Sequence, residues 1–171
     1  MLSHVIWVST FALYAERQIG LDSVGVGYVL AYIGLISIIL RGGLLPKLLD
    51  FFDEKRIKYA GVASIILGMV GSMFVNSWEG VLILATFFSF GSGVTRPIMY
   101  SDISKSVSQK NQGSVLGVAN SLGSIAQIFG PLIGGFMLNY FFPGSLGLVS
   151  AAVMTIGLIL IMRGDIISDE Q

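Results

Sequence analysis

The stretch GSVLGVANSLGSIAQIFGPLIG, residues 113–134, decides the fold of this chain. At 100° per residue along a helix, its small and polar residues fall within an arc of roughly 140°. Bulky apolar residues fill the opposite arc. Because the neighbouring segments are also apolar, we expect hydrocarbon on the bulky side and other helices or a wet cavity on the small and polar side. The stripe consists of Gly113, Gly117, Asn120, Gly123, Ser124, Gln127, Gly130, Pro131 and Gly134.

Composition places the chain in a membrane. Of its 171 residues, 54% are hydrophobic and 12% are charged, and the mean hydropathy is +0.82. A typical soluble domain carries about 25% charged residues, so this chain could not coat a soluble surface. The net charge is zero and there is no cysteine and a single histidine. We therefore expect contact with the lipid bilayer, no nucleic-acid partner, no metal site and no cofactor.

Six apolar segments predict an all-α membrane protein, because helices satisfy their own backbone groups in lipid. The expected helices, in one bundle over residues 1–171, cover about 4–15, 24–49, 57–76, 79–103, 112–141 and 145–162. The first is too short to cross about 30 Å of hydrocarbon. Either it begins with an interfacial turn, or it is truncated by about ten residues at its start, and we favour truncation.

Basic residues alternate between the two sets of loops. The loop after the second helix holds Lys47, Lys55, Arg56 and Lys58, and the loop after the fourth holds Lys105 and Lys110. The positive-inside rule then places these loops and the C-terminus in the cytoplasm, in a multi-pass protein of the plasma membrane. The helices also divide into two triplets inserted in opposite senses, which predicts two inverted three-helix repeats.

Polar stripes mark the expected helices 24–49, 79–103 and 112–141, whereas 57–76 and 145–162 resemble outer, scaffold helices. Such stripes either line a cavity or are ordinary packing surfaces, where small residues let backbones approach. Arg41 and Arg96 lie in the inner third of their helices. They either extend to the interface as anchors, or form ion pairs with Asp50 or Asp102 that break and re-form as helices move.

The run GGLLPKLLDFFDEKR, residues 42–56, resembles the cytoplasmic loop motif of the major facilitator superfamily, which reads roughly G-x-L-x-D-x-x-G-x-[RK]-[RK]. Leu48, Asp50, Lys55 and Arg56 match the motif. Pro46, Phe51 and Asp53 depart from it, as is usual for the copy in the second half of the family's twelve helices.

The stripe helix strengthens the resemblance. Residues 112–117 leading to 130–135 are similar to the eleventh helix of drug-efflux members, the tetracycline and multidrug antiporter branch. Residues 90–97 resemble their tenth helix, and residues 14–27 resemble the link between their seventh and eighth.

The resemblance implies the C-terminal half of a twelve-helix transporter, a carrier and not an enzyme, with its first helix clipped. It would move a small molecule by alternating access, as an exporter coupled to an ion gradient. A separate N-terminal six-helix bundle or a second copy would be the partner. Two alternatives stay open: a transport-inactive fragment or split-gene subunit that needs such a bundle, and a non-transporting membrane scaffold.

Site residues follow from the same comparison. The candidates for the substrate cavity are Phe11, Tyr14, Phe90, Asn120, Ser124 and Gln127. The candidates for the cytoplasmic motif and gating are Asp50, Lys55, Arg56, Arg41 and Arg96. Asp50 is expected to face the positive N-terminus of a helix in the other bundle and to act as a latch. Helix packing is assigned to Gly130, Pro131, Gly134 and Gly135.

Overall fold

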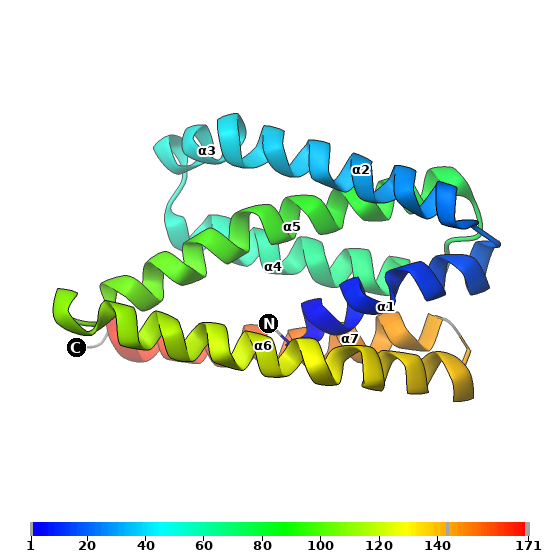
Figure 1. Cartoon of the computed structure of the whole chain (residues 1–171). Coiled ribbons are helices and arrows are strands. Elements are labelled where there is room, and N and C mark those ends of the chain that lie inside the picture. Colours follow the sequence, from blue (N-terminus) through cyan, green and yellow to red (C-terminus); the bar gives the residue numbers. More distant parts are fainter. Residues whose placement is uncertain (1, 143, 170–171) are drawn as a thin grey trace.

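The computed structural model describes residues 2–142 and 144–169, and Figure 1 shows them as a bundle of long helices. In chain order these are α1 (Leu2–Ile19), α2 (Ser23–Ile39), the π-helical segment η1 (Leu40–Leu44), α3 (Leu45–Phe51), α4 (Glu54–Gly71), α5 (Trp78–Lys105), α6 (Gln109–Tyr140) and α7 (Gly144–Asp169). Since these ranges contain helices and no strand, the all-α prediction is confirmed for the part of the chain described.

Four of the helices are long and apolar enough to cross a membrane. They are Ser23–Phe51, which joins α2, η1 and α3, and Trp78–Lys105, Gln109–Tyr140 and Gly144–Arg163. The remaining two, α1 and α4, have 18 residues each. At 1.5 Å per residue they are about 27 Å long, close to the thickness of the hydrocarbon layer. The chain is a multi-pass helical membrane protein.

The first helix is longer than the expected residues 4–15, because its polar end has partners. Arg17 donates a hydrogen bond to the backbone carbonyl of Leu138 in α6. Gln18 donates from Nε2 to the side-chain oxygen of Asn76 over 3.2 Å. These bonds let the helix continue past Glu16 and reach Ile19.

Glycine ends α1. Gly20 has a φ of 68°, a left-handed conformation that a residue without Cβ adopts freely. The backbone N–H of Gly20 donates to the carbonyl of Glu16, and that of Leu21 donates to the carbonyl of Ala15. The bond from Gly20 is that of the αL motif, in which the residue after the helix satisfies a carbonyl four residues back, and it turns the chain toward α2.

A π-helical segment interrupts the second span. It covers Leu40–Leu44 and lies just before Pro46, which has no N–H to donate and would clash with the preceding turn of a regular helix. The wider turn relieves that clash, and Gly42 and Gly43 give it the backbone freedom it needs. The expected helix 24–49 therefore continues to Phe51, but not as one regular α-helix.

The bounds of three more helices differ from expectation. Instead of 57–76, α4 runs from Glu54 to Gly71, because the acidic Glu54 in its first turn favours the positive end of the helix dipole. Beyond Gly71 the N–H groups of Met73 and Phe74 donate three residues back, and such tighter turns close the helix. α6 begins before the expected 112 and α7 extends beyond the expected 162.

Packing follows a simple order. α5 lies between α2 and α4, α4 also contacts α7, and α1 contacts both α6 and α7. In Figure 1, α5 and α6 diverge from their link at residues 105–109, and α1 lies beside α6 at the other end of the bundle. The end with that link also holds the α3–α4 connection, and we call it the charged end. One face of α4 is buried, with Ile65 and Met69, whereas Leu67 on the opposite face is exposed.

Glycines allow helix backbones to touch. A methyl group in place of a hydrogen on Gly91 of α5 would clash with the carbonyl oxygen of Gly61 in α4. On α6, a methyl group on Gly134 would clash with Thr10 of α1, and one on Gly130 would lie 3.0 Å from Cγ1 of Val5. The C-terminal part of the stripe is thus the α1–α6 contact. Gly135, beside it, faces open space, and Pro131 is exposed.

Two ion pairs join α4 to α5 at the charged end. Lys58 Nζ lies 2.9 Å from Asp102 Oδ2, and the Lys58 side chain is only 5% exposed. Lys105 Nζ lies 2.7 Å from Glu54 Oε2, and that lysine side chain is 63% exposed. The Lys58 ammonium is therefore shielded from water although Asp102 is 40% exposed, whereas Lys105 of the second pair is not shielded.

Gly134→Ala is expected to destabilise the bundle, and Gly135→Ala is its matched control. The first substitution overpacks the α1–α6 contact and should lower the free energy of unfolding by about 1–3 kcal/mol. The second meets no neighbour, so the better helix propensity of alanine makes it neutral or stabilising. Thermal unfolding of both variants in one nonionic detergent measures the difference. Equal midpoints would contradict the contact.

Asp102→Asn should cost more stability than Glu54→Gln. The first removes the carboxylate that lies 2.9 Å from the buried Lys58 ammonium, an expected loss of about 1.5–3 kcal/mol. The second breaks an exposed pair, for which about 0–1 kcal/mol is usual. Thermal unfolding midpoints of the two variants, measured side by side, test the order. A larger loss for Glu54→Gln would refute it.

Candidate functional site

A cavity of about 700 Å³ opens between α1, α5 and α6. Most of its lining residues belong to α5 and α6, which diverge from their link in Figure 1. Its walls consist of His4, Val5, Val8, Ser9, Ile65, Ser92, Thr95, Arg96, Met99, Tyr100, Asn120, Gly123, Ser124, Gln127 and Met154. α4 and α7 contribute one residue each, so they close the back of the cavity and the other three helices form its walls.

The middle of the stripe on α6 faces this cavity. Asn120, Ser124 and Gln127 all line it, as does Gly123. Tyr100 of α5 donates a hydrogen bond from its hydroxyl to Asn120 Oδ1 over 2.7 Å. That bond uses the acceptor of the Asn120 amide and leaves its NH₂ group for a ligand. Binding of a substrate by these residues stays a prediction.

The aromatic candidates lie elsewhere. Phe11 and Tyr14 belong to the hydrophobic core, where Tyr14 is completely buried. The Tyr14 hydroxyl donates to the backbone carbonyl of Ser72 over 2.5 Å. Phe90 packs against a second apolar cluster that contains Leu45. None of the three lines the cavity, because α1 and α5 turn these side chains toward the helices behind them.

Residues that sequence reasoning did not propose complete the walls. His4 stacks on Phe88 with ring centroids 4.9 Å apart and an interplanar angle of 27°, and it also lines the cavity. His4 could have been found from the sequence, because it is a single histidine in an apolar helix and ionisable residues within membrane segments are rare. Ser92, Met99 and Met154 carry no comparable signal in the sequence.

The two arginines differ in position. Arg96 lines the cavity, whereas Arg41 lies in the exposed π-helical segment. Neither forms an ion pair with the residues that the structure describes. The expected pairing with Asp50 or Asp102 is absent in that part of the chain, because Lys58 already binds Asp102. Among the described residues, Arg96 is thus an unpaired cation beside the cavity.

The polar stripe of α2 does not reach the cavity. Gly27 and Gly34 have no atom within 4 Å of where a Cβ would lie. The buried side of α2 instead carries Val26 and Val29. The Tyr32 hydroxyl lies 2.9 Å from Thr86 Oγ1 of α5. The stripe therefore lies on an uncovered surface of this bundle.

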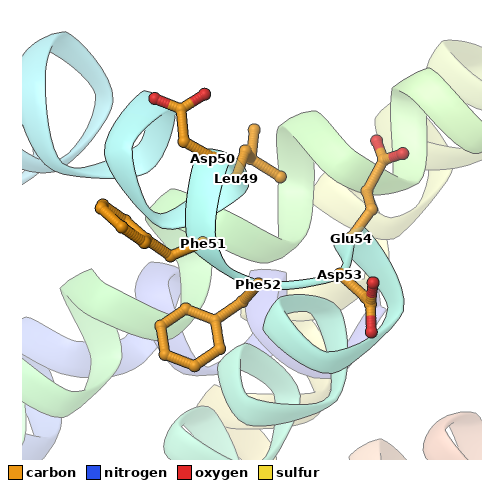
Figure 2. Close-up of a pocket in the computed structure, with 6 residues that line it drawn as sticks. All are labelled: Leu49, Asp50, Phe51, Phe52, Asp53 and Glu54. Atoms are coloured by element: carbon orange, nitrogen blue, oxygen red, sulfur yellow. The ribbon is translucent and has the colours of Figure 1, made fainter.

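The loop motif forms a shallow hollow of about 410 Å³ at the charged end (Figure 2). Its walls are the residues 49–54, and Asp50 points away from the ring of Phe52 in Figure 2. Lys55 and Arg56 lie in the first turn of α4. Arg56 Nε lies 3.3 Å from Asp53 Oδ2, in a pair that is exposed to solvent. Asp50 is also exposed and remains accessible to a partner.

The chain is similar to known proteins over most of its length. Residues 1–131 and 72–166 match the model of the Major Facilitator Superfamily in two overlapping segments. The chain is 30% identical over 137 residues to the tetracycline resistance protein, class D, of Salmonella ordonez, which covers 78% of this chain and 33% of that protein. It is 26% identical over 157 residues to multidrug resistance protein 2 of Bacillus subtilis, covering 90% of this chain and 38% of that protein.

A human relative is similar over the same region. Solute carrier family 67 member A1 is 22% identical over 158 residues, which cover 92% of this chain and 37% of that protein. The chain therefore spans little more than a third of the length of these relatives. No solved structure matches it significantly. The family match covers nearly all of the helices described above, and this chain belongs to the major facilitator superfamily.

Proposed function

We propose that this chain is one half of a transporter that moves a small molecule across the membrane by alternating access. The cavity between α1, α5 and α6 is the observation that supports this most directly. It has the size of a small-molecule site and combines apolar walls with a few polar groups. In this proposal Asn120, Ser124 and Gln127 contact the substrate, and the protein is a carrier and not an enzyme.

Export is the proposed direction, coupled to an ion gradient. Two relatives are named for resistance to tetracycline and to several drugs. Removal of the compound from the cell would give such resistance. The proposed setting is the plasma membrane, with the charged end and the C-terminus in the cytoplasm, because that end carries Lys47, Lys105 and Lys110.

A second six-helix bundle completes the transporter in this proposal, supplied by a separate N-terminal half or by another copy. α1 to α4 and α5 to α7 would be its two inverted repeats. The aligned region covers only 33% to 38% of the relatives' length. Two uncovered glycine surfaces, Gly113 with Gly117 on α6 and Gly27 with Gly34 on α2, have room for close helix contact.

Asn120→Leu and Gln127→Leu test the cavity in a complete transporter that contains this half. Each replaces a polar amide in the wall by hydrocarbon, so transport of a polar substrate should fall by roughly tenfold. Asn139→Leu on the same helix is the matched control, because Asn139 is exposed and does not line the cavity. Uptake into inverted vesicles measures transport. Unaltered rate and substrate preference in both cavity variants would contradict the assignment.

Asp50→Asn tests the latch. Loss of the carboxylate removes an attraction to a helix N-terminus worth about 0.3–1 kcal/mol. The transport cycle should therefore slow by about two- to fivefold with little change in substrate affinity. Asp53→Asn, at the exposed pair with Arg56, is the control. Turnover and binding are measured separately, and an equal loss of both would argue against a latch.

A further inference from the structure

We propose that the ligand of the cavity carries an anionic group, such as a carboxylate, that binds Arg96, and an apolar body that contacts the methionines. This inference rests on the proposed function, because it takes the cavity between α1, α5 and α6 as the substrate site. It adds the charge of the substrate, which the names of the three relatives described above do not supply.

The walls of the cavity carry a positive charge. Arg96 is the only lining residue with a permanent charge, and no aspartate or glutamate lines the cavity among the residues that the structure describes. A cationic ligand would meet repulsion from Arg96 and, among the described residues of this chain, no lining carboxylate to offset it. A guanidinium attracts anions and repels cations, so Arg96 can set the preferred sign of the ligand.

The Arg96 guanidinium is available to bind a ligand. The acidic residues near the charged end of α5 are already taken, since Asp102 binds Lys58 over 2.9 Å and Glu54 binds Lys105 over 2.7 Å. Within the described ranges, Arg96 has no hydrogen bond or ion pair. A guanidinium presents a planar fork of donors that matches a carboxylate in two parallel hydrogen bonds.

The neutral groups define the rest of the ligand. The Asn120 NH₂ group is left as a donor by the bond from Tyr100, and the amide of Gln127 also lines the cavity. Met99, Met154 and Val8 supply flexible apolar surface beside them. Together they favour an amphipathic anion over a small hydrophilic one.

Binding of two xanthene dyes to the full chain in nonionic detergent tests the inference. A fluorescein is anionic and a rhodamine ester is cationic, while their ring systems offer similar apolar surface. We expect fluorescence anisotropy to show tighter binding of the fluorescein, and added salt should weaken it. Arg96→Gln should weaken fluorescein binding by roughly 10- to 100-fold. Arg41→Gln is the matched control, since it removes an arginine outside the cavity.

Each outcome has a distinct meaning. Tighter binding of the rhodamine, or equal fluorescein binding by wild type and Arg96→Gln, would overturn the anion preference. If Gln127→Leu still weakened dye binding in that case, the cavity would stand as the site. If neither dye bound the wild-type chain, the charge preference would fail, while the cavity assignment would still be decided by the Asn120→Leu and Gln127→Leu variants of the complete transporter. Should Arg96→Gln not fold, the preference of the wild-type chain and its salt dependence decide the question alone.

Discussion

Close backbone contact between helices, made where side chains are smallest, is the constraint on which this bundle depends. Hydrocarbon surrounds the helices, so two apolar faces gain little by meeting each other and tight packing has to hold them together. Gly91 meets the Gly61 carbonyl between α5 and α4, and Gly147 of α7 lies against Met69 of α4. α4 thus has close neighbours on two sides. Its position between α5 and α7 follows from these contacts.

α1 is held by bonds on one side and lines the cavity with the other. Ser3 donates to the carbonyl of Ser150 over 2.5 Å, and Tyr14 donates to the carbonyl of Ser72. Both bonds point toward α7 and α4, behind the cavity. Val8, on the other face, is left to line it. A helix fixed in this way gives the cavity a firm wall, although α5 and α6 diverge beside it.

Residue pattern predicted some parts of the site and missed others for physical reasons. The stripe on α6 could be predicted because a helix places every third or fourth residue on one face, and Asn120 and Gln127 stand out against apolar neighbours. The burial of Phe11 and Tyr14 in the core could not be predicted, since aromatic residues suit a core and a cavity wall equally. The partner of Asp102 was also beyond the pattern, because the sequence suggested Arg41 or Arg96 and only packing brings Lys58 to it.

The stripe on α6 divides along its length. Its C-terminal turns, with Gly130 and Gly134, touch α1, while the turns from Asn120 to Gln127 face the cavity. Because these tasks fall on separate turns of one helix, a change of a cavity residue leaves the contact with α1 undisturbed. Selection can therefore alter what such a protein recognises, one residue at a time, without first having to rebuild the scaffold. Families that encounter ever new toxic compounds would benefit from that independence.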